Sequence, residues 1–135
     1  MLITATQKFI RTSPRKLRLV AQTVRKIESP QKAVAYLEMV PQKAGKVLGK
    51  VIRTAIANAA NNLKLDPNSL SLKVIMINEG PTYKRGQPVS RGRFHAIQKK
   101  TSHATVILES STPETTGKSQ ISSTKSQTTN KSKNV

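Results

Sequence analysis

Cysteine is absent from this 135-residue chain, and acidic residues are scarce. Without cysteine the chain can form no disulfide, cysteine zinc site or thiol nucleophile. Its six carboxylates lie singly along the sequence, so a paired-carboxylate active site or a metal cage has almost no material. The only histidines, His95 and His103, lack partners for a metal site. We therefore expect no metal and no cofactor.

Long hydrophobic runs are missing as well. The longest, residues 33–37, has five residues, whereas a membrane-spanning helix needs about 20. The first eleven residues lack the apolar stretch of a secretory signal. The chain has no nucleophile elbow, P-loop or glycine-rich dinucleotide turn. We expect an intracellular protein that is not an enzyme, takes no small-molecule substrate and binds no membrane.

Positive charge is what the chain has in excess. Its 24 lysines and arginines face only six acids, which gives a formal net charge of +18. A surplus of this size repels itself in a compact fold and is typical of proteins that bind an anionic partner, most simply a nucleic-acid backbone.

The composition changes sharply near residue 110. Residues 111–135 consist mainly of Ser, Thr, Lys, Gln and Asn, and such a segment cannot bury enough apolar surface to offset its ordering entropy. We predict a disordered, polar, basic tail over 111–135. Residues 1–110 keep 20 basic and five acidic residues, and we predict that they form one nucleic-acid-binding domain.

The N-terminal half predicts one strand and three helices. Residues 2–10 mix β-branched and polar residues, as a strand does. Ser13-Pro14 and Ser29-Pro30 each predict a helix start, with the serine hydroxyl as N-cap and proline as the first helical residue. Pro41 is expected to end the second helix and to open a third, whose apolar residues recur at helical spacing.

Four basic residues of this third helix are spaced three, four and three apart, which places them along one side. They are Lys43, Lys46, Lys50 and Arg53. No acid lies between Lys43 and Leu65, so we interpret the stripe as an unpaired ridge that faces phosphates, with a merely solvated face as the alternative. Gly45 and Gly49 in the same helix indicate close packing against another helix.

The C-terminal half of the domain predicts two strands, at residues 70–78 and 101–109. If they pair antiparallel, their midpoint lies near Val89. The connection between them, about residues 80–100, is too long for an unstructured loop in a compact domain. We interpret it as a hairpin arm that outgrows the sheet, and ten residues at ~3.3 Å each would carry its tip about 30 Å from the body.

The arm contains no acid and six basic residues: Lys84, Arg85, Arg91, Arg93, Lys99 and Lys100. Gly86, Pro88 and Gly92 are expected at its tip. Tyr83 and Phe94 are expected roughly opposite each other, either packed together or stacked on RNA bases. A two-stranded ribbon of this length is marginal in water by itself, so we expect something anionic to surround it.

Three motifs of the sequence are distinctive when taken together. They are the hairpin segments 78–85 (NEGPTYKR) and 99–103 (KKTSH) with Pro88, Gly92, Arg93 and Ile97 between them, the opening helix 13–21 (SPRKLRLVA) and the helix end 55–59 (AIANA). These motifs resemble those of the large-subunit ribosomal protein twenty-two family. The resemblance covers residues 3 to about 109. It implies an α+β fold of three helices packed on a three-stranded antiparallel sheet, with two strands extended into a long arm.

The same resemblance implies a structural constituent of the large ribosomal subunit that binds ribosomal RNA, supports subunit assembly and lines the peptide exit tunnel with its hairpin tip. The implied partners are large-subunit ribosomal RNA, neighbouring ribosomal proteins and the nascent peptide. The chain is then expected in cytoplasmic ribosomes, with an organellar ribosome as the alternative, and not as a homo-oligomer.

Candidate RNA-binding residues come from the first and third helices, the arm and the arm's base. They are Arg11, Arg15, Lys16, Arg18, Lys43, Lys46, Lys50, Arg53, Lys84, Arg85, Arg91, Arg93, Lys99, Lys100 and His103. The candidate tunnel-lining tip is Gln87, Pro88, Val89, Ser90 and Arg91. Gln87, Val89 and Ser90 stand where the family commonly has Arg, Arg and Ala, and Arg91 restores one charge from a shifted position.

A second function remains compatible with the residues, that of an architectural DNA-bending protein. Such proteins also use basic β-arms with a proline near the tip. They work as dimers and need an apolar dimer face, whereas the apolar faces here suffice for the core of a monomer. A monomer that binds structured RNA would support the ribosomal function, and a dimer that kinks duplex DNA would support the other.

Overall fold

The computed structural model describes residues 1–110 and contains three helices, three strands and two short 3-10 turns in that part of the chain. The elements are β1 (Leu2–Ile10), α1 (Pro14–Val24), α2 (Pro30–Met39), α3 (Lys43–Leu63), η1 (Pro67–Ser69), β2 (Leu70–Pro88), η2 (Ser90–Gly92) and β3 (Phe94–Ser110). The predicted tail, 111–135, lies outside the described residues.

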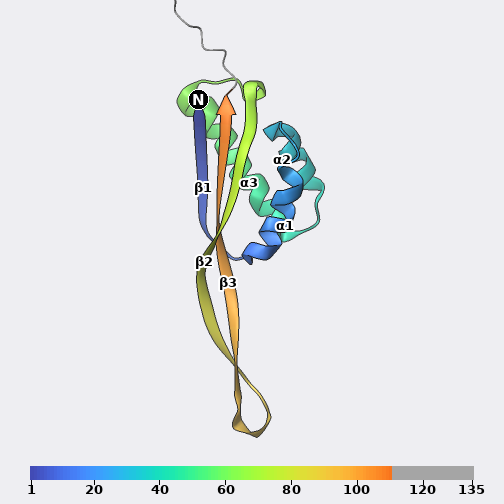
Figure 1. Cartoon of the computed structure of the whole chain (residues 1–135), viewed down its shortest axis with the longest axis vertical. Coiled ribbons are helices and arrows are strands. Elements are labelled where there is room, and N and C mark those ends of the chain that lie inside the picture. The colour runs from blue at the N-terminus through green and yellow to red at the C-terminus, as the bar shows by residue number, and fades with distance from the viewer. Residues whose placement is uncertain (111–135) are drawn as a thin grey trace, which may run out of the picture.

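The helices lie together beside a three-stranded antiparallel sheet, and β2 and β3 continue beyond it as a two-stranded arm (Figure 1). The strand order is β1-β3-β2, so β3 is central and pairs with both neighbours. The predicted α+β fold with an extended hairpin is confirmed. In residues 1–110, no helix is both long and apolar enough to cross a membrane.

The core lies between the sheet and the helices. Alternate residues of β3 (Ala104, Val106 and Leu108) are buried, as expected where one sheet face packs and the other is open. The helices meet this face through their apolar stripes, whose fully buried members include Leu17, Leu37, Leu48 and Ile52. In α3 the helical periodicity of the sequence therefore identified the packed face correctly.

The helix starts differ from the prediction in one respect. Ser13 and Ser29 occupy the N-cap positions with proline following, but neither serine hydroxyl bonds to the helix. The backbone explains the starts instead, because proline fixes its own φ and keeps the preceding residue extended. Helix α3 begins at Lys43 with Gln42 as N-cap, two residues after the predicted Pro41, because the buried face of α3 begins only at Ala44.

The predicted close helix contact at Gly45 and Gly49 is confirmed. A Cβ atom at Gly45 would lie 3.1 Å from the Leu37 carbonyl oxygen of α2, and one at Gly49 would lie 3.7 Å from the Leu37 Cβ. Both glycines are buried. Their small size lets α2 and α3 approach each other closely.

Strand β2 has two extra residues relative to the part of β3 that it pairs with, which corrects the predicted tip. Register shifts between Leu72 and Val74, and between Glu79 and Thr82, each place one extra residue in β2. As a result Gly86 and Gln87 pair with Ala96 and His95 inside the ladder, and Pro88 faces Phe94. The turn is centred on Arg91, not Val89.

The two aromatic residues of the arm are not opposite each other, contrary to the prediction. Tyr83 pairs with Lys99, and the same shift in register moves Phe94 opposite Pro88. The Phe94 ring lies instead over Gly86, where an added Cβ would come within 2.8 Å of it. Gly86 therefore leaves space for the Phe94 ring and is not a turn residue.

Side-chain hydrogen bonds fix the base of the arm to the body. The Thr101 hydroxyl donates to the Pro81 carbonyl (2.6 Å), and the Ser102 hydroxyl donates to the Thr12 carbonyl (2.8 Å). Both hydroxyl-bearing residues are buried. Because these bonds join β3 to β2 and to the segment after β1, they hold the arm in a set direction.

Gly80 tests this arrangement. A Cβ at this position would lie 2.6 Å from the Thr101 Oγ1, so Gly80→Ala must displace the Thr101 hydroxyl from its bond to Pro81. We expect Gly80→Ala to lower the free energy of unfolding by about 1–3 kcal/mol, the usual cost of overpacking. Chemical denaturation measures the loss. Gly49→Ala is the control, because its nearest neighbour would be 3.7 Å away; an equal loss in both variants would contradict the role of Gly80.

Candidate nucleic-acid interface

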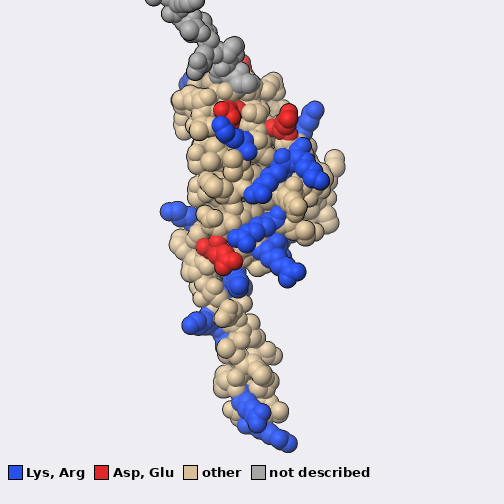
Figure 2. All heavy atoms as spheres, in the orientation of Figure 1, with Lys and Arg blue, Asp and Glu red and all other residues tan. Residues whose placement is uncertain are grey.

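Cationic side chains are distributed along the molecule from the helical body to the far end of the arm (Figure 2). In that view the acidic side chains form only a few small patches, all on the body. In the described part of the chain, every residue from 81 to 100 is exposed and none is acidic. The arm therefore presents its charges to a surrounding partner and contributes no side chain to the core.

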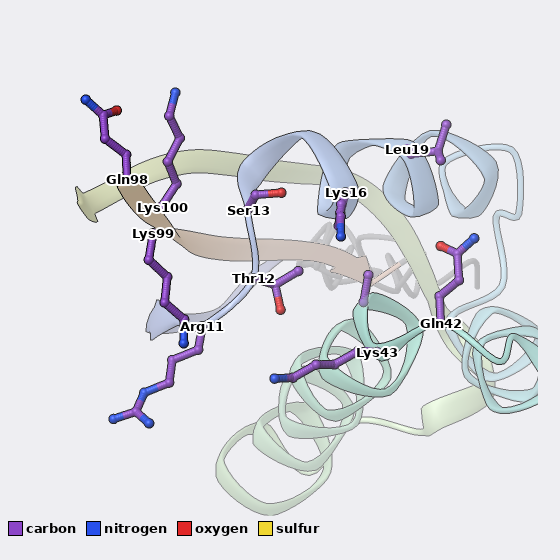
Figure 3. Close-up of a pocket in the computed structure, with 11 residues that line it drawn as sticks. Arg11, Thr12, Ser13, Lys16, Leu19, Gln42, Lys43, Gln98, Lys99 and Lys100 are labelled. Carbon is purple, nitrogen blue, oxygen red and sulfur yellow. The ribbon is translucent and has the colours of Figure 1, made fainter. Parts of the chain in front are cut away.

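A groove of about 700 Å³ lies where the arm leaves the body (Figure 3). Its lining comes from the segment after β1, the first turns of α1 and α3, and the base of β3. Five of the predicted RNA-binding residues meet here: Arg11, Lys16, Lys43, Lys99 and Lys100. Helix packing and the arm's register bring together cations that lie up to 89 residues apart in the sequence.

Two helix N-termini border this groove. Ser13 and Lys16 belong to the start of α1, and Gln42, Lys43 and Ala44 belong to the start of α3. Neither helix has an acidic residue in its first turn or a side-chain cap. The first backbone amides of a helix have no partner within it and carry partial positive charge, so both ends add to the attraction for an anion.

The stripe on α3 continues away from the groove. Lys43, Lys46 and Lys50 are exposed, as predicted. Arg53 is not unpaired, however, because it forms an ion pair with Glu38 of α2. The prediction considered only acids within α3, whereas the helix packing places Glu38 beside Arg53. The free part of the stripe therefore consists of the three lysines.

A second cationic cluster lies on the arm near its base. The Arg85 guanidinium lies over the Tyr83 ring, 5.6 Å from the ring centroid. Arg11 and Lys99 line a small hollow with these two residues. An aromatic face beside three cations is typical of sites where a nucleotide stacks and its phosphate is bound. Lys84 lies between Tyr83 and Arg85 in the exposed part of β2.

The tip combines positive charge with exposed apolar groups. The amide of Val89 donates to the carbonyl of Arg93 (2.9 Å) and closes the turn. Arg91 and Gly92 both have positive φ, 62° and 68°; for Arg91 this is a conformation that non-glycine residues adopt uncommonly. Phe94, just after the turn, is 73% exposed. Of the five predicted tip residues, Val89, Ser90 and Arg91 lie in the turn, while Gln87 and Pro88 belong to β2.

Two predicted RNA-binding residues also have structural partners. Arg18 on α1 donates through its Nε and Nη2 to the Ile77 carbonyl at 3.3 and 3.1 Å. Because β2 is an edge strand, this bond satisfies an otherwise open carbonyl, and Arg25 does the same at Ile75. His103 accepts a hydrogen bond from the Phe9 amide (3.0 Å) through its Nδ1, at the point where the arm leaves the sheet.

Sequence reasoning missed the uncharged residues of the groove. Thr12, Ser13, Gln42 and Gln98 line it beside the cations. No local pattern marks these residues, because their proximity comes only from tertiary packing. Arg15, which was predicted, lies on a neighbouring shallow surface of α1 with Arg18. Within residues 1–110 no three His, Asp or Glu side chains are grouped so that they could hold a metal ion.

Known proteins are similar to this chain over the same folded region. The family described as ribosomal protein L22p/L17e matches residues 5–109. A large ribosomal subunit protein uL22 from Oleidesulfovibrio alaskensis is 50% identical over 107 residues, covering 79% of this chain and 96% of that protein. The uL22 protein of Pseudothermotoga lettingae is 45% identical over 108 residues, covering 80% of this chain and 77% of that protein.

Proposed function

The chain belongs to the ribosomal protein L22p/L17e family, and from this premise we propose that residues 1–110 form its RNA-binding domain and that the arm lines the peptide exit tunnel. It is a structural constituent of the large ribosomal subunit and not an enzyme, and its partners are ribosomal RNA and other ribosomal proteins. The resemblance noted in the sequence is thereby confirmed.

One observation supports RNA binding most strongly: an acid-free, fully exposed arm joins a groove lined by five cations. Such a ribbon buries too little to be stable alone, and its charges repel one another. Phosphates around the arm and in the groove would remove both problems. The proposed contacts are the groove and arm cations, the three lysines of α3 and Arg15, with Arg18 and Arg53 using any donors left by their protein partners.

The proposed role of the tip rests on its exposure. Val89, Ser90 and Arg91 form a tight turn at the far end of the arm, where nothing else in residues 1–110 lies close. A turn carried far from the body can reach a passage inside the subunit that the body cannot enter. We therefore propose the nascent peptide as the partner of the turn residues. The family assignment leaves no observation in favour of DNA bending.

Sedimentation tests the RNA-binding part of this function. We expect the full-length protein to sediment with bacterial large ribosomal subunits and to remain bound through a wash of moderate salt. Electrostatic binding with about six to ten phosphate contacts should give a slope of log affinity against log salt of around −4 to −9, at ~0.7–0.9 per contact. Equal affinity for duplex DNA and large-subunit ribosomal RNA, measured by filter binding at one salt concentration, would contradict it.

A further inference from the structure

Thr12 forms the floor of the groove and has an unusual environment. The residue is 9% exposed, and its Oγ1 is buried with no hydrogen-bond partner within the described residues. The backbone around it is fixed, because the Thr12 amide donates to the Ile10 carbonyl (2.8 Å) and the Thr12 carbonyl accepts from Ser102 (2.8 Å). An unpaired buried hydroxyl carries its full desolvation cost, and valine would fill the same space without it.

The hydroxyl faces the space that the cations surround. In Figure 3, Lys16 and Lys43 extend from α1 and α3 on opposite sides of Thr12, and the Thr12 oxygen points between Arg11 and Lys43. The two helix starts that border the groove lie at Ser13 and Gln42, adjacent to these side chains. A hydroxyl donor, lysine ammonium groups and helix N-termini are the groups that bind phosphate oxygens in proteins.

We propose that this groove is a built phosphate site for one segment of RNA backbone, in which the Thr12 hydroxyl donates to a non-bridging phosphate oxygen while Lys16 and Lys43 neutralise it. The inference rests on the proposed RNA-binding function and assigns it a specific anchor point at the base of the arm. Leu19, which is 62% exposed and lines the same groove, offers an apolar surface to the attached sugar or base.

Separating the hydroxyl from the charges gives the sharpest test. Thr12→Val removes a neutral donor, so we expect the affinity for large-subunit ribosomal RNA to fall about tenfold, the value of one hydrogen bond to a charged group, with an unchanged salt slope. Lys16→Gln with Lys43→Gln should instead make the slope shallower by roughly 1.4–1.8, from two lost phosphate contacts. The melting temperature of Thr12→Val should equal or exceed that of the wild type, because the hydroxyl has no partner to lose.

Matched controls exclude general effects of charge and shape. Lys26→Gln with Lys32→Gln removes the same charge from the segment after α1 and from α2, neither of which lines the groove at these positions, and Thr4→Val makes the same side-chain change on the exposed face of β1. Both should leave affinity and slope nearly unchanged. Equal effects of the groove and control variants, with wild-type binding to ribosomal RNA intact, would overturn the phosphate site and leave the proposed function standing. Failure of the wild type to prefer ribosomal RNA would overturn both.

The source of the phosphate is tested separately. Inorganic phosphate, added at constant ionic strength in place of chloride, should displace the RNA no better than chloride does, because a single free anion lacks the neighbouring contacts. Displacement by phosphate that disappears in the Lys16→Gln, Lys43→Gln variant would show that the groove takes a free anion, and would overturn RNA as its ligand.

Discussion

Removal of residues 83–97 is expected to leave the body folded and bound to the large subunit while changing the properties of the exit tunnel. The deleted residues are all exposed, so the core loses nothing. Thr82 pairs with Lys100, and the deletion joins Thr82 to Gln98, which leaves two residues to form the new turn. Four basic residues and no acid are removed, which relieves repulsion. We expect the melting temperature to change by no more than a few degrees.

The tunnel is where the effect should be large. Ribosomes with the shortened arm should differ from wild-type ribosomes in sensitivity to tunnel-blocking macrolides and in stalling on peptides that sense the constriction. The matched control keeps the full arm but replaces Lys84, Arg85, Arg91 and Arg93 by Gln. A change in the deletion alone would assign the effect to the physical presence of the turn, and a change in both would assign it to charge. Unaltered macrolide sensitivity and stalling, with the shortened arm confirmed in the ribosome, would refute the tunnel role.

The second large effect concerns the lysines of α3. Replacing Lys43, Lys46 and Lys50 together by Gln should make the salt slope of ribosomal RNA binding shallower by about 2–3, at ~0.7–0.9 for each lost phosphate contact. Their exposure and the lack of acids in α3 mean that the fold should be unaffected. Filter binding over a range of salt concentrations measures the slope, and circular dichroism checks the fold.

Arg53 provides an internal comparison for that experiment. It shares the stripe with the lysines but forms an ion pair with Glu38, so Arg53→Gln should change the slope less than any single lysine replacement does. A triple replacement at Lys8, Lys26 and Lys32 controls for net charge. If this control flattened the slope as much as the α3 variant, the stripe would contribute no more than general attraction.

Local features of the sequence predicted most of the elements. Strand β1 was predicted to the residue, and the Ser-Pro pairs located the starts of α1 and α2. These signals succeed because proline geometry and side-chain periodicity act within one or two turns of the chain. The predicted serine caps were wrong because the geometry of proline alone accounts for each helix start. The helix therefore does not need a hydrogen bond from the serine hydroxyl.

Predictions that needed two distant segments were less successful. Two extra residues in β2 moved the turn to Arg91 and separated Tyr83 from Phe94. The first bulge lies at Lys73, near the start of β2, and the second lies at Gly80-Pro81, where β2 leaves the body. Only the pairing of β2 with β3 shows that each position holds an extra residue. Likewise, the ion pair between Arg53 and Glu38 depends on the way in which α2 crosses α3. Gly45 and Gly49 allow the two helices to approach closely, but they do not specify how the helices cross.

The sequence by itself determined the chemistry of this protein: an excess of positive charge, an arm without acids, a core of three amphipathic helices and a sheet, and motifs that identify the family. Composition and short-range spacing suffice for these properties because each depends on residue totals or on residues close together in the chain. Only the tertiary structure decided which cations share a site. Lys16, Lys43 and Lys99 line one groove with Thr12, whose hydroxyl has no partner within residues 1–110, because the packing of α1, α3 and β3 brings these segments together.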